Sequence, residues 1–308
     1  MIKKVVFTLS FLLSFFAYLE PKADNPTQEK LIVTASFSIL GDVIKNIGGD
    51  LVTVNVIVGP NQDTHVYEPT PDDNLLIISS DLVVINGLSF ETWFERLVSA
   101  SGYKKPIIVA SQGIPFHKMM EPQISNEPVP DPHVWNDVRH VATWVYNIKK
   151  ALQEFDPQNA AVYEERATLY LKELQNLDRW IKEQFKDVPE ESCKVITAHD
   201  AFNYFEKAYG LVFLSPQGLS TTDEPSAHEM ASLIKQIKKE KIKTIFVENI
   251  SSQRLIRQLA AETGAKIGGT LYSDALSTAE EPASTYIKLM ESNVKTLAQS
   301  LGCFVSPL

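Results

Sequence analysis

The sequence predicts an α/β protein of two lobes, each with a parallel sheet flanked by helices, joined by one long rigid helix. Strand-like and helix-like segments alternate between residues 31 and 110, and the same alternation resumes after Pro189. Between these regions the apolar pattern becomes that of a long amphipathic helix. We therefore divide the chain into a leader, an N-terminal lobe, a connecting helix and a C-terminal lobe, at residues 1–24, 25–157, 158–187 and 188–308.

The leader has the pattern of a secretory signal peptide. Lys3 and Lys4 precede a short apolar run, Val5 to Ala17, so we expect cleavage near Ala23 and export to the periplasm. The run is shorter than the ~20 residues that a membrane span needs. Because Pro21 stands where a small residue is usual, an uncleaved anchor is the alternative. No cysteine stands at the end of the run, so a lipid anchor has no attachment point.

In the N-terminal lobe, short apolar segments predict strands and the amphipathic segments between them predict helices. Gly48 and Gly49 end the first helix, Pro71 starts the second, and Gly102 closes the third. This alternation is typical of parallel sheets. The expected strands are 31–37, 51–58, 81–86 and 106–110, and the expected helices are 38–47, 71–80 and 91–100.

The connecting helix is predicted from an amphipathic pattern that extends from Val138 to Phe185 and is interrupted only at Asp156-Pro157. Its second part, residues 159–186, is long for a helix in a globular protein. A rigid connector between two lobes explains that length.

In the C-terminal lobe the alternation of strands and helices returns. Ser226 and Glu229 form a capping box for one helix, and Gly264 stops the next. The expected strands are 194–199, 211–215, 244–248 and 265–272, and the expected helices are 201–209, 227–240 and 252–263.

Composition excludes some classes of function. The net charge of −9 and the pI near 5.3 provide no basic surface, so we do not expect nucleic acid as a partner. The chain has two cysteines, Cys193 and Cys303, which is too few for a disulfide scaffold. Export to an oxidising compartment would allow these two to pair as a structural disulfide.

Three histidines far apart in the sequence are candidate metal ligands. His65, His133 and His199 each lie just beyond a predicted strand or before a helix, and Asp274 follows the last predicted strand. The carboxyl ends of strands are where α/β sheets present ligand-binding residues. Three imidazoles and one carboxylate suit Zn(II) and are acceptable to Mn(II), and one ion per chain would be bound.

Three acidic residues could support this site. Asp63 and Glu68 either orient His65 or cap the adjacent turn. Glu248 is either an acceptor behind a ligand or an acid at a helix start, and the helix start is the simpler interpretation. The other histidines, His117, His140 and His228, are interpreted as ordinary surface or core residues.

The segments around the four candidates resemble a known family, the metal-specific periplasmic receptors of ABC importers, or ZnuA/TroA-like solute-binding proteins. The matching segments occur in the family order and extend over essentially the whole mature chain. They are Gln62 to Thr70, Asp131 to Trp135, Thr197 to Phe202 and Tyr272 to Leu276.

The resemblance implies two α/β lobes joined by a helix, with one metal ion held between them by His65, His133, His199 and Asp274. It implies a monomeric receptor, not an enzyme, that delivers its ion to a membrane permease driven by an ATPase and meets the membrane only through that permease. Manganese and iron members usually have Glu at the third ligand, so His199 indicates zinc. Zinc members often have a His-rich loop, which residues 117–130 lack.

Two alternatives to a receptor remain at this point. A secreted zinc metallohydrolase would need an open metal position and a base, for which Glu248 is the only candidate. An adhesin-like surface protein would use the metal structurally. For the receptor, we expect release through a modest shift of the C-terminal lobe or of the loops carrying His199 and Asp274.

Overall fold

The fold is described here from a computed structural model that covers residues 29–119, 125, 127–189, 193–219, 221, 225–303 and 305–308. The expected leader, residues 1–24, lies outside the described residues.

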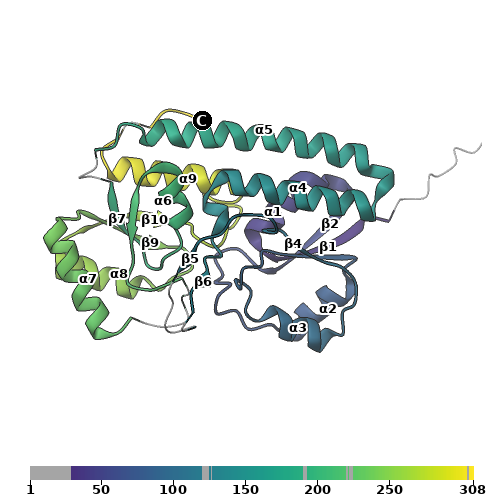
Figure 1. The fold of residues 1–308 in the computed structure, drawn as a ribbon, viewed down its shortest axis with the longest axis horizontal. Helices are drawn as coiled ribbons and strands as arrows, with labels where there is room; N and C mark the ends of the chain where they lie inside the picture. The colour runs from purple at the N-terminus through teal and green to yellow at the C-terminus, as the bar shows by residue number, and fades with distance from the viewer. Residues whose placement is uncertain are drawn as a thin grey trace, which may run out of the picture.

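The N-terminal lobe contains a four-stranded parallel sheet in the order β2-β1-β3-β4. Helices cover both of its faces, with α2 and α3 on one side and α1 on the other (Figure 1). The last five residues of β1 are buried, as expected for a parallel strand covered on both sides. The strands are β1 (Leu31–Phe37), β2 (Val52–Val58), β3 (Leu82–Ile85) and β4 (Ile107–Val109), and the helices are α1 (Ser38–Gly48), α2 (Pro71–Ser79) and α3 (Phe94–Ser101).

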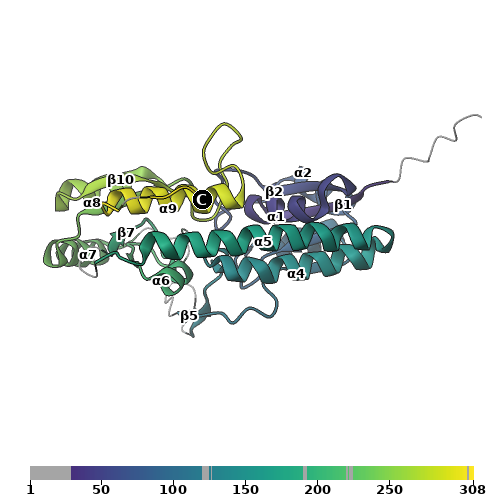
Figure 2. The same ribbon diagram turned by 90° about the horizontal axis from the view of Figure 1, so that it is seen from above.

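Two long helices follow. α4 (Val138–Phe155) ends at the predicted break, Asp156-Pro157, and α5 (Ala160–Phe185) runs along both lobes (Figures 1 and 2). α5 packs against α1 and α4 of the N-terminal lobe and against α6 (Asn203–Tyr209) and α9 (Tyr286–Ser300) of the C-terminal lobe. The long helix of the predicted fold class is therefore confirmed. No helix among the described residues combines the length and the apolar character that crossing a bilayer requires.

The C-terminal lobe contains a second four-stranded parallel sheet, in the order β10-β9-β7-β8. The predicted capping box is present, because Ser226 and Glu229 exchange hydrogen bonds at the start of α7. The two-lobed α/β fold class is thus confirmed, while the exact domain boundaries remain a proposal. The further elements are β7 (Lys194–Ile196), β8 (Val212–Leu214), α7 (Ala227–Glu240), β9 (Thr244–Glu248), α8 (Gln253–Thr263) and β10 (Lys266–Leu271).

Two features of the fold were not predicted. β5 (Lys118–Met119) and β6 (Val129–Pro130) form a short antiparallel pair, and two-residue strands are too short for a periodic apolar pattern. The helix α9 does have a signal, since Thr285 caps its start and Leu289, Met290 and Leu297 lie on its buried face.

The two lobes share a continuous apolar core. Buried side chains of β1, α1, α4, α5, α6 and α9 belong to one cluster, and a smaller cluster lies between β9 and helices α7 and α8. Cys193 and Cys303 do not form a disulfide in the structure, so the pairing considered from the sequence is absent from it. Packing around α5 joins the two lobes into one apolar core.

Candidate metal centre

The structure brings the four candidate residues together between the lobes. His65 lies in the loop after β2, His199 in the loop after β7 and Asp274 in the loop after β10, and His133 precedes a short 3₁₀ helix, Val134–Asn136. One donor atom from each of the four lies within 4.8 Å of all the others. The parallel sheets thus present three of the four at the carboxyl ends of their strands.

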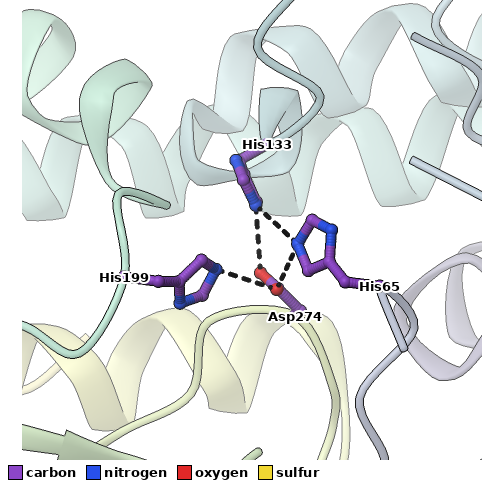
Figure 3. Close-up of side chains that lie close together, drawn as sticks. All are labelled: His65, His133, His199 and Asp274. Atoms are coloured by element: carbon purple, nitrogen blue, oxygen red, sulfur yellow. Dashed lines mark hydrogen bonds and ion pairs between the residues drawn. The ribbon is translucent and has the colours of Figure 1, made fainter. Parts of the chain in front are cut away.

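The donor atoms converge on one small volume (Figure 3). Nε2 of His65 lies 3.2 Å from Nε2 of His133, and the Asp274 carboxylate lies 3.2 Å from His65 Nε2 and 3.1 Å from His199 Nε2. The distance from His133 Nε2 to Asp274 Oδ1 is longer, 3.7 Å. Donors around a tetrahedral zinc with bonds of about 2.0–2.1 Å are about 3.3 Å apart, so these spacings suit such an ion.

The centre is buried. His133, His199 and Asp274 are fully buried, and His65 is 8% exposed. The Asp274 carboxylate faces the three imidazoles, whose Nε2 atoms lie 3.1–3.7 Å from its oxygens. Burying a carboxylate costs free energy unless a positive charge compensates it, and a cation among the four groups would supply that charge.

His199 is held from behind by Glu248, the last residue of β9. Oε2 of Glu248 accepts a hydrogen bond from Nδ1 of His199 at 2.6 Å, and Oε1 accepts from the backbone N–H groups of Ala198 and His199 at 2.7 and 3.0 Å. Glu248 is therefore an acceptor behind a candidate ligand. The simpler interpretation of Glu248, an acid at a helix start, is wrong.

His133 is held in the same way by Asp131, a residue to which the sequence assigned no role. Oδ1 of Asp131 accepts from Nδ1 of His133 at 2.8 Å and from the His133 backbone N–H at 3.0 Å. Asn203 of α6 donates to the other oxygen at 3.1 Å. The Asp-x-His spacing was the available signal, since the backbone of the histidine folds back onto such a carboxylate.

Asp63 and Glu68 differ from these two acids. Oδ1 of Asp63 accepts from the backbone N–H of His65 at 2.9 Å but does not hold its ring, and Glu68 is exposed and takes no part in these hydrogen bonds. The His65 ring instead packs edge-on against Phe90, with centroids 4.9 Å apart. Of the two, only Asp63 supports the loop that carries His65.

Two tryptophans fix the loops around the centre. Nε1 of Trp93 donates to the carbonyl oxygen of Thr64 at 2.9 Å, next to His65. Nε1 of Trp135 donates to the carbonyl oxygen of Ser273 at 2.7 Å, next to Asp274. Trp135 follows His133 in the N-terminal lobe while Ser273 lies in the C-terminal lobe, so this bond ties the two lobes at the site.

The charged groups of the centre shift one another's pKa values. Burial would raise the pKa of Asp274, but the imidazoles of His199 and His133 outweigh it and hold that pKa well below its usual range. Burial would lower the pKa of His199, but Glu248 and Asp274 raise it well above its ordinary value. Burial lowers the pKa of His65 despite the attraction of Asp274. The centre is therefore built to hold positive charge beside Asp274.

The other three histidines lie away from the centre. His117 stacks on Tyr204 with centroids 4.7 Å apart, and His140 packs edge-on against the same ring at 5.2 Å. His228 is exposed near the start of α7. None of them belongs to a group of metal-binding side chains among the residues described.

Comparison with known proteins establishes the family. The model of ZnuA, described as zinc-uptake complex component A, periplasmic, matches residues 33–300. The chain belongs to this family. It is a metal-binding, substrate-binding component of an ABC transporter and not an enzyme, which removes the metallohydrolase alternative. Components of this kind work with a permease and an ATPase.

Relatives of this ZnuA-family chain are named for different metals. It is 34% identical to the iron-binding protein YfeA of Yersinia pestis, over 91% of this chain and 89% of that one. It is 31% identical to the manganese-binding lipoprotein MntA of Halalkalibacterium halodurans, over 97% and 99% of the two chains. The family and its relatives therefore establish a metal as the class of substrate without selecting one ion.

Solved structures share the fold. The periplasmic zinc-binding protein TroA of Treponema pallidum superposes with a TM-score of 0.83 at 29% identity, over 89% of this chain and 99% of that one. The manganese-bound periplasmic metal-binding protein of Candidatus Liberibacter asiaticus has a TM-score of 0.79 at 32% identity, over 88% and 100%. The two-lobed architecture of this chain is thus that of known metal receptors.

Proposed function

We propose that this chain is an exported receptor that captures one divalent transition-metal ion at His65, His133, His199 and Asp274. It binds zinc more tightly than manganese and delivers its ion to the permease and ATPase of an ABC importer. The observation that carries the proposal is the convergence of three imidazoles on one fully buried carboxylate, with one donor atom from each of the four side chains within 4.8 Å of the others.

The donor set supports zinc as the preferred ion. Three imidazole nitrogens and one carboxylate oxygen complete a tetrahedron, the geometry that zinc adopts most readily in proteins. For a given set of nitrogen and oxygen ligands, affinity rises from manganese through iron to zinc. His199 matters most here, because a third imidazole in place of a carboxylate favours the borderline-soft zinc ion over the harder manganese ion.

The leader and the family support a periplasmic location for the receptor. Residues 1–24 have the signal-peptide pattern, and the matching family model describes a periplasmic component. Several relatives are named lipoproteins. For this chain we propose a soluble monomer in the periplasm, released by cleavage near Ala23.

Competitive titration of the purified protein with zinc and with manganese tests this function. We expect one ion per chain, with zinc displacing manganese. The zinc affinity of the His133→Ala variant should fall more than about 100-fold. Mutating a residue that only hydrogen-bonds to a metal ligand already lowers metal affinity about 10–100-fold, and this change removes a ligand itself. Circular dichroism establishes that the variant is folded.

The matched control is His228→Ala, since His228 is exposed and outside the centre. This variant should bind zinc like the parent protein. A His133→Ala variant that binds zinc as tightly as the parent would overturn the assignment of the site, and manganese binding tighter than zinc would overturn the proposed preference.

A further inference from the structure

The three imidazoles of the centre differ in how firmly they are held. His133 and His199 each donate from Nδ1 to a buried carboxylate, Asp131 or Glu248, which also accepts from the backbone N–H of the same histidine. Within the described structure, no carboxylate accepts from Nδ1 of His65. A ring held at one nitrogen and at its backbone can turn only if that carboxylate turns too, so His65 has the most freedom.

Asp63 shows why His65 differs. Like Asp131, it lies two residues before its histidine, and its Oδ1 accepts from the histidine backbone N–H, at 2.9 Å. Its second oxygen, however, accepts a hydrogen bond at 2.6 Å from Oγ1 of Thr221, a residue of the C-terminal lobe. The carboxylate that could have held the ring instead holds the whole loop to the opposite lobe.

Asn61 ties the same loop to the C-terminal lobe a second time. Its backbone N–H donates to the carbonyl oxygen of Leu276 at 2.8 Å, and its side chain donates to Oε2 of Glu281 at 2.8 Å. Asn249 donates to Oδ1 of Asn61 at 2.9 Å. Apart from Leu276, these partners are exposed or only partly buried, so water can replace them when the loop moves.

His65 is also the most exposed of the four candidate ligands. His65 is 8% exposed while the other three residues are fully buried, and Val66, the next residue, is 48% exposed. Asp63 and Thr221 line a surface pocket of about 160 Å³ that also reaches Ala198, beside His199. Water therefore reaches the Asp63–Thr221 bond from outside, on the side of the molecule where the His65 loop meets the other lobe.

We propose that His65 is the exchangeable ligand of the centre and that the hydrogen bond between Asp63 and Thr221 is the latch that keeps it in place. The inference rests on the proposed function, because it assigns one step of metal exchange to one ligand. The ion enters and leaves when the loop carrying His65 swings away, while His133, His199 and Asp274 stay together. This replaces the movement of His199 and Asp274 that we expected from the sequence. Asp63 is thus a positioning residue that acts through His65.

A latch of this kind has a distinct kinetic signature. The Asp63–Thr221 bond does not touch the donor atoms, so weakening it favours the open loop whether or not an ion is bound. Association and dissociation then accelerate together and the equilibrium affinity stays nearly constant. A residue that merely supports the bound geometry would change the dissociation rate and the affinity but not the association rate.

The experiment compares Thr221→Val, which removes the donor at nearly constant volume, with Thr221→Ser, which keeps it. Zinc association is followed by stopped flow, and dissociation by transfer to an excess of chelator. Losing one charge-assisted hydrogen bond changes the equilibrium between the closed and the open loop by about tenfold. We therefore expect both the association and the dissociation rate of Thr221→Val to rise about tenfold. Its Kd should change less than about threefold, and Thr221→Ser should behave like the parent.

Two further variants complete the design. Glu281→Ala removes the exposed acceptor of Asn61 and should accelerate both rates in the same direction, which keeps the test valid if Thr221→Val folds poorly. Thr168→Val is the matched control, because Thr168 is exposed on α5 and its hydroxyl donates to the carbonyl oxygen of Glu164 in the same helix. It should leave both rates unchanged.

Unchanged rates in Thr221→Val and Glu281→Ala would overturn the latch, as would an increase in dissociation alone. Equal acceleration in Thr221→Val and Thr221→Ser would overturn it too, because the hydroxyl would then be irrelevant. These outcomes leave the proposed function intact, because that function is tested by the equilibrium binding of zinc and manganese to the parent protein and to His133→Ala.

Discussion

Glu248 binds His199 at two points, accepting from the ring Nδ1 at 2.6 Å and from the backbone N–H at 3.0 Å. This pair of hydrogen bonds places the proton of the neutral ring on Nδ1 and leaves the Nε2 lone pair for a metal ion. The contact joins the end of β9 to the loop after β7, so the order of strands in the C-terminal sheet orients the ligand.

Replacing Glu248 by Gln should weaken zinc binding about 10–100-fold. The amide keeps the size of the carboxylate but can present an N–H to Nδ1, which then favours the tautomer with its proton on Nε2, where the metal should bind. Competition with a chromophoric chelator measures the affinity. Glu164→Gln, an exposed change on α5, is the control and should bind zinc like the parent. Unaltered affinity in Glu248→Gln would mean that Nδ1 does not set the ligand state of His199.

Zinc binding should weaken as the pH falls. Because Glu248 and Asp274 raise the pKa of His199 well above its ordinary value despite its burial, the metal-free protein favours the cationic ring, which carries a second proton on Nε2. The metal must displace that proton, so each decrease in pH favours the metal-free form. Calorimetry in buffers of different ionisation enthalpy should detect release of about one proton per ion at pH near 7. Binding without proton release would contradict the assignment of His199.

Removing the metal should leave the protein folded. One continuous apolar core joins the lobes through α5, and it does not depend on the four candidate ligands. Chelation should therefore leave the far-ultraviolet circular dichroism unchanged. Tm should fall only because the binding contribution to the free energy of unfolding is lost, which is about 2.7 kcal/mol if the free ion had been at 100 times its Kd. Unfolding on chelation would instead support the adhesin-like alternative, in which the metal is structural.

Trp135→Phe should reduce both stability and metal affinity. The change deletes the donor to the carbonyl oxygen of Ser273 and leaves a void in a fully buried position. We expect a loss of about 2–4 kcal/mol in the free energy of unfolding, measured with urea on the metal-free protein. Trp180→Phe is the control. Trp180 donates to the carbonyl oxygen of Ser306, a residue that is next to none of the four candidate ligands in the sequence. Losing this bond should reduce stability without changing zinc affinity.

Much of the fold could be predicted because its signals are local. The break between α4 and α5 was predicted from Asp156-Pro157, and the start of α7 from the capping box of Ser226 and Glu229. The helix α9 had an equally local signal. The pair β5–β6 had none, because two residues per strand cannot show a period and the pairing depends on contacts made elsewhere in the fold.

The candidate site was predictable in its residue types and not in its supporting contacts. Histidines after strands indicated where donors would gather, because parallel sheets present loops at one edge. The partner of His199 is Glu248, 49 positions away in the sequence, and only the pairing of β7 with β9 brings them together. The Asp63–Thr221 bond between lobes depends on how those lobes pack, which no local pattern records.

A crystal structure of the zinc-loaded protein, with anomalous diffraction collected at the zinc edge, tests the central claim most directly. We predict one anomalous peak per chain, bonded at about 2.0–2.2 Å to Nε2 of His65, His133 and His199 and to the Asp274 carboxylate. A peak at any other group of side chains, or no peak between the lobes, would contradict the account.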